Sequence, residues 1–417
     1  MTALTANALT EIPEYATSQR EFLEYSKASH YYSKSVGKLI DLANNYVSDA
    51  EEAFRNGAKA IWTNGYRWEA LFLYSLGITP VSYTEMGRYG LYEDMRIAED
   101  YYQFPVETCA MVKCALGQWH KRINSNTIKQ ILGNASSCEP FNLAWEILRK
   151  KGYDVHCNEA IYRGPNVNGV RLEELIKFMS EQLLDIAEWA TGERRVDEEL
   201  MRCELIRKNR MIGKLKKFLD LRRKVPFYVK SLPCVFLAIS GFNNYFGKPR
   251  EFEEAIDELI LEMENEPVNP DDLKKAIPLV WAGMIGQEFG VYDVIDQAGG
   301  SILGLWGIPY RLVREDIPPL EALVRYYYDN GQAGAGIYAR NVIESEVKRL
   351  NAKGVIFYGY IGCSLTSVDR EMWRRHFHKQ GLLCLNLEGS FQIGPPSGQI
   401  MTRVRAFVET LNSNRNL

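Results

Sequence analysis

The feature that most constrains the fold is an alternation of short apolar runs with amphipathic segments. In the first part of the chain, GAKAIW (57–62), ITPVSY (78–83), KQILGNA (129–135) and YDVHC (153–157) have the composition of buried strands. Helical patterns lie between them, over 66–77, closed by Gly77, and over 140–152. Buried strands that alternate with helices predict a parallel sheet.

The middle of the chain has a helical period instead, and the alternation then returns. Long helices are predicted over about 171–191, 196–222 and 251–265, and SLPCVFLAISGF (231–242) opens another. From residue 276 we expect strands in AIPLVWAG, GGSILGL, GVIFYG (354–359) and LLCLNLE (382–388), and helices over 288–298, near 340–350, over 367–380 and over 398–412. The pattern predicts an α/β protein with a helical N-terminal extension (1–56), a first α/β domain (57–165), a helical segment (166–270) and a second α/β domain (271–417).

Size and charge narrow the class of protein. A chain of 417 residues with 46% hydrophobic content exceeds what one core usually organises. The start, MTALTANALTEIPEYATSQREF, has no signal-peptide pattern, and no apolar run approaches the roughly 18 residues that a membrane span needs. The net charge is −3, and the basic cluster at 207–224 has apolar residues at helical spacing. We therefore expect a cytoplasmic protein that binds neither nucleic acid nor membrane.

Three of the eight cysteines fall at positions where α/β proteins bind ligands. Cys138 follows a predicted strand in NASSCEP, and Cys363 follows another in YIGCS, so both lie at carboxyl ends of parallel strands. Cys109, in ETCAMVKCALG (107–117), precedes a helix, where backbone N–H groups lower the pKa of a thiol. Thiols so placed on two domains suggest an iron–sulfur cubane between them. Without a local CxxC spacing, buried structural thiols explain the same residues equally well.

Several longer blocks, taken in order, resemble the 2-hydroxyacyl-CoA dehydratase and benzoyl-CoA reductase superfamily, most closely its double-cubane cluster proteins. The resemblance runs from about residue 57 to 411. Its blocks are GAKAIWTNGYRWEALFLYSLGITPVSYTE, ETCAMVKCALG, SSCEPFNLAWEILRKKGYDV, GVIFYGYIGCSLTSVDREMWRRHFHKQGLLCLNLEG and SGQIMTRVRAFVETL. It implies two flavodoxin-like domains that hold an iron–sulfur cluster through three cysteines, at Cys109, Cys138 and Cys363.

The resemblance also implies a partner. In this superfamily a separate ATP-hydrolysing activator, itself an iron–sulfur protein, supplies one electron at very low potential. This chain resembles the component that receives the electron. Its nearest string to a Walker A loop, GFNNYFGKP (241–249), has one residue too many between the glycines and a Pro in place of the Mg²⁺-binding Ser or Thr.

Two positions in the expected substrate site differ in how well they match the family. The family's catalytic subunits have a small hydroxyl residue near the end of the first strand and a Glu near the end of the second. Here Trp62 occupies the first place, with Thr63 beside it, and Glu85 matches the second as the expected catalytic residue. A Trp at that place argues against ordinary acyl-CoA dehydration, or marks the non-catalytic subunit of a heterodimer.

The remaining cysteines bear on the size of the cluster. A double cubane, [8Fe-9S], needs twice as many protein thiolates as a single [4Fe-4S] cluster of this type, and Cys114, Cys157 and Cys234 are the candidates for the additional ligands. Cys114 joins Cys109 only if Cys109 lies before the helix proper. Cys203, within a helix, and Cys384, early in a strand, are expected to be core thiols.

We therefore expect an iron–sulfur oxidoreductase, a homodimer, that depends on an ATP-driven activator and reduces a small molecule. Two alternatives remain open. The chain is a catalytic or partner subunit of a 2-hydroxyacyl-CoA dehydratase or acyl-CoA reductase, in a heterodimer, or it is a non-enzymatic electron carrier.

Overall fold

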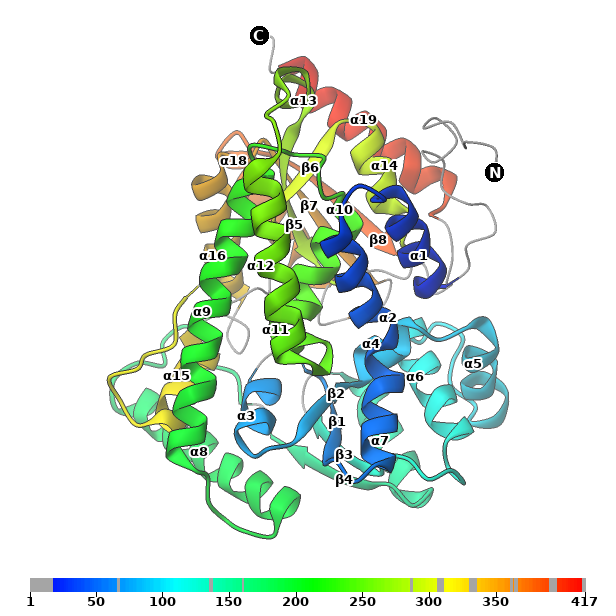
Figure 1. The fold of residues 1–417 in the computed structure, drawn as a ribbon, viewed down its shortest axis with the longest axis vertical. Coiled ribbons are helices and arrows are strands. Elements are labelled where there is room, and N and C mark those ends of the chain that lie inside the picture. Colours follow the sequence, from blue (N-terminus) through cyan, green and yellow to red (C-terminus); the bar gives the residue numbers. More distant parts are fainter. Residues whose placement is uncertain are drawn as a thin grey trace.

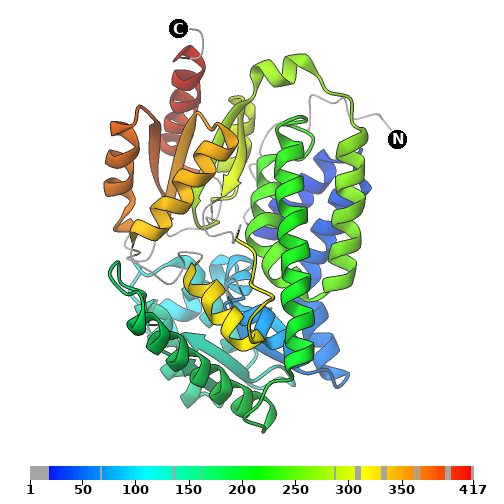
Figure 2. The same cartoon turned by 90° about the vertical axis from the view of Figure 1, so that its left-hand side faces the viewer.

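The computed structural model describes residues 18–65, 68–134, 138–159, 161–285, 288–305, 311–329, 336–360, 363, 367–389 and 396–414. Two α/β units lie one above the other along the longest axis, with long helices beside them (Figures 1 and 2). This arrangement confirms the predicted α/β fold with two flavodoxin-like parallel-sheet domains.

In the described part of the chain, eight strands form two sheets of four. The strands are β1 (Ala60–Thr63), β2 (Thr79–Ser82), β3 (Gln130–Asn134), β4 (Asp154–Asn158), β5 (Ile277–Gly283), β6 (Gly300–Leu305), β7 (Gly354–Tyr360) and β8 (Leu383–Gly389). Their orders are β2-β1-β3-β4 and β6-β5-β7-β8, and neighbouring strands are parallel in both sheets. In both sheets the strand order reverses at the first strand, between β1 and β3 and between β5 and β7. Such a reversal opens a crevice at the carboxyl edge, where ligands bind in open α/β sheets.

The helices before β5 form the N-terminal extension, the connections of the first sheet and the helical segment. They are α1 (Gln19–Ser29), α2 (Lys34–Arg55), α3 (Glu69–Ser75), α4 (Tyr83–Arg88), α5 (Tyr92–Arg96), η2 (Ile97–Tyr101), α6 (Ala110–Lys121), α7 (Glu139–Lys150), α8 (Val170–Thr191), α9 (Glu198–Arg222), α10 (Ser231–Phe236), η3 (Leu237–Gly241), α11 (Phe242–Asn244), η4 (Tyr245–Gly247), α12 (Pro249–Asn265) and α13 (Pro270–Lys275).

The helices after β5 belong to the second α/β unit, with one exception. They are α14 (Val291–Gln297), α15 (Pro319–Asp329), α16 (Gly336–Leu350), α18 (Arg370–Lys379) and α19 (Gly398–Asn414). The exception is α15, which packs with α8 and α9 on the first sheet's side and buries Tyr326, Tyr327 and Tyr328 there (Figure 2).

Helices cover both faces of the first sheet. Ile61 of β1 faces a core formed with α3, α8, α9 and α15, whereas its neighbour Trp62 faces a core formed with α6 and α7. Neighbouring side chains on a strand point to opposite faces, and here both faces are buried. Because both faces are buried, the strands appear in the sequence as continuous runs of apolar residues.

The second sheet is covered in the same way. In β7, Val355 and Phe357 face α16 and α18, whereas Ile356 and Tyr358 face α14 and α19. The second of these cores does not stop at the sheet. It continues through α10 and α12 of the helical segment to Phe22 of α1 and Leu39 of α2. The N-terminal extension therefore belongs to a core that it shares with the helical segment and the second sheet.

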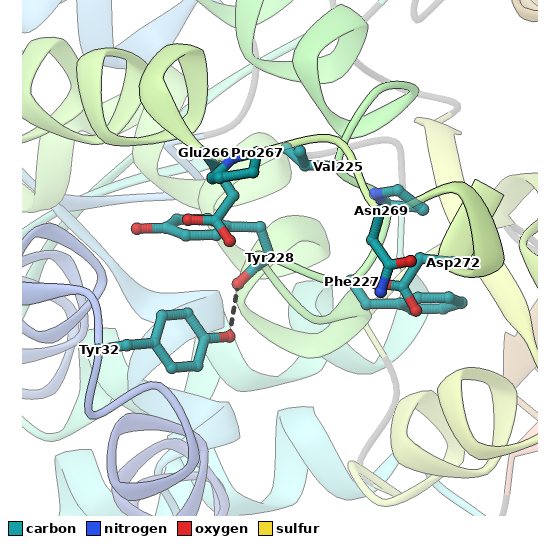
Figure 3. Close-up of a pocket in the computed structure, with 9 residues that line it drawn as sticks. Tyr32, Val225, Phe227, Tyr228, Glu266, Pro267, Asn269 and Asp272 are labelled. Carbon is teal, nitrogen blue, oxygen red and sulfur yellow. Dashed lines mark hydrogen bonds between the residues drawn. The ribbon is translucent and has the colours of Figure 1, made fainter.

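Polar contacts also attach the N-terminal extension to the helical segment. Nε2 of buried His30 accepts the backbone N–H of Lys230 at 3.0 Å, and Nδ1 lies 2.6 Å from the carbonyl oxygen of Ser26. The Tyr32 hydroxyl donates to the carbonyl of Tyr228 at 2.7 Å, at the edge of a surface hollow of about 330 Å³ (Figure 3). The bond between His30 and Lys230 and the bond between Tyr32 and Tyr228 fix the turn between α1 and α2 against the segment that follows α9.

Two further observations concern the sequence predictions. Cys203 is exposed on α9, so the prediction that it is a core thiol was wrong; Cys384 is partly buried beside the core under α16 and α18. A mid-helix position does not decide which face a side chain takes. Within the described ranges, no helix combines the length and the apolar character that a membrane crossing requires.

Candidate functional site

Cys109 lies at the amino end of α6, immediately before the helix. It is the N-cap residue, with an extended ψ of 125°, and its carbonyl oxygen accepts the N–H groups of Val112 and Lys113. The buried ammonium group of Lys113 donates to Glu99 at 2.7 Å and to the carbonyl of Val106 at 2.6 Å. These bonds hold the loop before Cys109, so the thiol has a fixed place.

Cys138 and Cys363 follow the two strands at which the sheet order reverses. Cys138 is the N-cap residue of α7, beyond β3. Cys363 follows β7, and its backbone N–H donates to the carbonyl of Tyr360 at 3.1 Å. Both cysteines are partly buried, as Cys109 is. Each of the three thiols thus lies at the carboxyl edge of a sheet or at a helix start beside it.

The structure brings these three cysteines together. Burial raises the pKa of Cys109 to about 11, and the charge of Cys363 adds to the rise. Burial also raises the pKa of Cys138 to about 12, with contributions from Cys109 and Cys363. Thiols influence one another's titration in this way only when they lie close together. The expectation that the helix start lowers the pKa of Cys109 was wrong in its net direction, because burial outweighs the N–H groups of Val112 and Met111.

The donor set consists of thiols, the ligand type of an iron–sulfur cluster. Among the described residues, no three His, Cys, Asp or Glu side chains are arranged to hold one ion. In a cubane each protein thiolate binds its own iron atom, so the thiols need not meet at one point. Three soft sulfur donors, drawn from both sheets, are the ligand type that such clusters take.

The other predicted ligands have different surroundings. Cys114 is fully buried on α6, one turn beyond Cys109, and its thiol lies 3.8 Å from the carbonyl oxygen of Leu91. Charge on Cys109 still influences the titration of Cys114. Cys157 instead contacts Arg149, whose Nη2 lies 3.2 Å from its Sγ. Cys234 is buried against β6, 3.8 Å from the carbonyl oxygen of Ile302. The structure does not bring Cys157 or Cys234 to the three clustered thiols.

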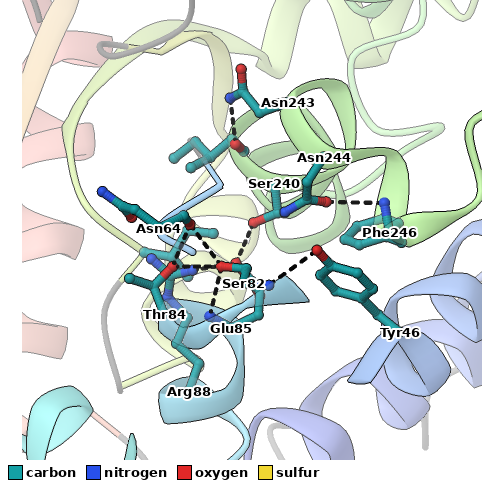
Figure 4. Close-up of polar contacts among 12 residues, drawn as sticks. Tyr46, Asn64, Ser82, Thr84, Glu85, Arg88, Ser240, Asn243, Asn244 and Phe246 are labelled. Carbon is teal, nitrogen blue, oxygen red and sulfur yellow. Dashed lines mark hydrogen bonds and ion pairs between the residues drawn. The ribbon is translucent and has the colours of Figure 1, made fainter. Parts of the chain in front are cut away.

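Glu85 lies in a buried polar network at the start of α4 (Figure 4). Its carboxylate pairs with Arg88 one turn later and accepts the hydroxyl of Ser240 at 2.6 Å. Its backbone N–H donates to Ser82, the N-cap residue of α4. Glu85, Arg88 and Ser240 have no exposed surface. The predicted catalytic carboxylate is thus oriented by its own helix and by the helical segment.

Tyr360 connects this network to the cysteines. It is the last residue of β7, and its buried hydroxyl donates to the carbonyl of Ile285 at 2.7 Å. Burial raises its pKa well above the ordinary range, and its titration also responds to Cys109, Arg88 and Cys363. Tyr360 therefore lies among the thiols and the guanidinium group.

The position of Trp62 corrects an argument made from the sequence. Its side chain is fully buried against Trp119 on the side of α6 and α7, and its indole N–H donates to the carbonyl of Ile128 at 3.2 Å. It is therefore a core residue and does not occupy a substrate site. Thr63, the last residue of β1, is also fully buried, and its hydroxyl has no hydrogen-bond partner among the described residues. The hydroxyl at the end of the first strand belongs to Thr63.

Three residues of this site were not predicted from the sequence: Arg88, Ser240 and Tyr360. Arg88 follows Glu85 at the spacing of one helical turn, which was the available signal. Tyr360 directly precedes the segment that carries Cys363. Ser240 gave no local signal, because only the tertiary fold brings the helical segment to α4.

Two parallel sheets with clustered thiols at their carboxyl edges define a class of α/β proteins with a sulfur-donor site. Comparison with known families specifies the class further. The family described as 2-hydroxyglutaryl-CoA dehydratase, D-component, matches residues 71–411. The chain belongs to this family, and it is therefore a component of the 2-hydroxyacyl-CoA dehydratase type. No curated protein matches the chain.

Proposed function

We propose that this chain is the electron-accepting component of an activator-dependent dehydratase or reductase of acyl-CoA thioesters. The observation that carries the proposal is the convergence of Cys109, Cys138 and Cys363 from both α/β units. These cysteines would hold one iron–sulfur cluster, which, when bound, supplies one-electron reduction at low potential. The electron comes from a separate ATP-hydrolysing activator, because the chain has no Walker A loop of its own.

The chain's own residues supply the remaining chemistry of the site. Glu85 is the acid or base, since its carboxylate lies in the network with Arg88 and Ser240, in the first turn of the helix that follows β2. Arg88 pairs with the carboxylate in a buried position, and Ser240 orients it. The buried Tyr360 and the two helix starts shield part of the surface of the thiols, which are themselves partly buried. Thr63 provides a hydroxyl to a substrate at the end of β1.

A double cubane is the second candidate, and Cys114 supports it because it lies near Cys109. A double cubane needs further thiolates, however, and Cys157 and Cys234 contact Arg149 and β6 instead. The placement of Trp62 in the core also removes the reason to reject an acyl-CoA substrate. The geometry therefore favours a single cluster over a double cubane. It also favours dehydration of an acyl-CoA thioester over reduction of another small molecule.

The test combines metal analysis with an activity assay. We expect about four iron atoms and as many acid-labile sulfides per chain in anaerobically purified protein, whereas about eight indicate the double cubane. The protein alone should be inactive, and a matching activator with Mg-ATP and a strong reductant should start turnover of a 2-hydroxyacyl-CoA thioester. ATP-dependent reduction of other small molecules, with no turnover of any thioester, contradicts the proposal.

A further inference from the structure

The helical segment contributes a rigid turn to the edge of the first sheet. The turn follows the π-helix η3 and contains α11 and η4. Two consecutive residues in it, Tyr245 and Phe246, have left-handed φ values of 55° and 47°, which non-glycine residues rarely adopt. Strained backbone of this kind persists only where surrounding contacts fix it, and it is common at ligand sites.

Buried side chains fix this turn from two sides. The ammonium group of Lys208, on α9, donates to the carbonyl of Phe242 at 2.8 Å and to the side-chain oxygen of Asn243 at 3.0 Å. The hydroxyl of Tyr74, on α3, donates to the carbonyl of Asn244 at 2.7 Å. The backbone of Asn244 is therefore held against the first sheet.

The contacts of Asn244 also fix the orientation of its carboxamide (Figure 4). Its Oδ1 accepts the backbone N–H of Phe246 at 2.9 Å, and only the amide oxygen can accept that bond. The amide nitrogen must therefore point the other way. Asn244 has no exposed surface, yet its Nδ2 has no acceptor among the residues that the structure describes. A buried donor without a partner is costly unless a ligand or water completes it.

The amide nitrogen faces a small space beside Gly65. A Cβ atom placed on Gly65 would lie 3.6 Å from Nδ2 of Asn244 and 3.4 Å from Cβ of Ser82, which is ordinary van der Waals contact. The space thus accepts one small atom next to the amide donor. Thr63, whose hydroxyl also has no partner among the described residues, pairs in register with Ser82 on the neighbouring strand. Two buried polar groups that lack partners within the described ranges therefore flank the same strand end.

The chemistry of these two groups selects the ligand. The carboxamide donates, and a threonine hydroxyl both donates and accepts, so together they match a hydroxyl group better than a carbonyl, which only accepts. A carboxylate would enter a buried place in which Arg88 already pairs with Glu85, and burial of an uncompensated charge is costly. The subsite therefore suits an uncharged hydroxyl.

From this geometry we infer that Asn244, on the helical segment, donates a hydrogen bond to the 2-hydroxyl group of the acyl substrate and selects substrates that carry it. The inference rests on the proposed function, because it assumes an acyl-CoA ligand at this edge. It adds a specificity-determining residue from outside the two α/β units. Ser240, one turn earlier in the same segment, contacts Glu85, so the segment would place the hydroxyl next to the carboxylate.

Calorimetric titration of the intact holoprotein tests this inference without turnover. The ligands are 2-hydroxybutanoyl-CoA and butanoyl-CoA, which differ only in the hydroxyl group. Asn244→Asp keeps the acceptor for the Phe246 N–H and removes the donor. We expect the ratio of the two affinities to fall roughly tenfold or more, because a lost hydrogen bond to a buried donor costs at least this factor. A carboxylate at this place can itself accept the 2-hydroxyl, so Asn244→Ala, which offers neither a donor nor an acceptor there, is measured beside it and should show the same fall.

Asn265→Asp is the matched control, since it makes the same chemical change at an exposed position on α12, outside the turn and the subsite. It should keep the native ratio. An unchanged ratio in the Asn244 variants, or an equal fall in Asn265→Asp, overturns the role of Asn244 and leaves the proposed function intact. If the native protein binds neither thioester, this result contradicts the proposed acyl-CoA function. It then also contradicts the proposal that the subsite binds the hydroxyl group of an acyl substrate.

Discussion

At the residue scale, the site depends on the face of the strand from which each side chain projects. Trp62 and Thr63 are neighbours on β1, and the pleat directs them to opposite faces of the sheet. Trp62 therefore fills the core beside Trp119, and Thr63 ends the strand near Ser82. A bulky residue next to a substrate position need not enter it.

The role of Trp62 leads to a first prediction. Trp62→Phe should lower the free energy of unfolding by about 1–3 kcal/mol, because the variant loses buried area and leaves the carbonyl of Ile128 without its indole donor. Iron content and substrate preference should stay as in the native protein. Chemical denaturation, metal analysis and a thioester panel measure these three properties. A changed substrate preference with unchanged stability contradicts the assignment of Trp62 to the core.

The sequence predicted the chemically distinctive residues of the site better than their partners. Cys109, Cys138 and Cys363 fell at strand and helix ends, so the local pattern placed them at one edge. Contacts such as Ser240 with Glu85 join residues far apart in the chain, and no local pattern encodes them. The surroundings of Cys234 were missed for the same reason, since its contact with β6 is tertiary. Cys157 instead contacts Arg149, eight residues earlier in the chain, on the helix that precedes its strand.

At the scale of elements, the attachment of α1 to the helical segment depends on a neutral imidazole. Burial lowers the pKa of His30 from 6.5 to about 4, and the nearby charges of Lys230 and Arg222 add to this, against the Ser26 carbonyl. The neutral ring can donate from Nδ1 to Ser26 and accept at Nε2 from the Lys230 N–H. An imidazolium has no acceptor for the second bond.

This contact predicts a pH dependence of stability. The pKa in the folded state is lower than in the unfolded chain, so between pH 6.5 and 4 the unfolded chain binds a proton that the folded protein does not. Stability should therefore fall as the pH decreases through this window, by roughly 3 kcal/mol in total. Urea titrations at several pH values measure the loss. His30→Gln, which keeps an acceptor without a titrating group, should lose this part of the pH dependence; an unchanged pH profile in the variant shows that another group is responsible.

Most elements were predictable from the sequence for a physical reason. Apart from the edge strands β4 and β8, which are only partly buried, the strands are buried on both faces or nearly so, and such strands appear as compact apolar runs between turn residues. The short elements α4, α5 and η2 were not predicted, because they are shorter than the window in which a helical period can be recognised.

At the scale of the whole molecule, the three clustered cysteines come from both α/β units. Cys109 and Cys138 belong to the connections of the first sheet, and Cys363 follows β7 of the second. A cluster bound to all three would act as a cross-link between the units. The division of the chain near residues 57, 166 and 271 stays a prediction, as do the homodimer and the cytoplasmic location.

This cross-link gives the last prediction. Replacement of Cys109, Cys138 or Cys363 by Ser should remove the visible absorption of the cluster and increase the radius of gyration in small-angle scattering, because metal binding is coupled to the contact between the units. Cys203→Ser, at an exposed position on α9, should change neither property. Full iron content in the Cys138→Ser variant contradicts the assignment of the ligands.

The core shared by α1, α2, the helical segment and the second sheet has a consequence for biosynthesis. The apolar faces of α1 and α2 leave the ribosome first, but the residues that cover them, such as Phe252 and Ile256 of α12, lie far later in the chain. At ordinary translation rates the nascent chain would expose these faces for roughly 10 to 40 seconds. During that interval the growing polypeptide is a candidate client for chaperones that shield hydrophobic segments, and synonymous codons that slow translation before α12 would lengthen its exposure.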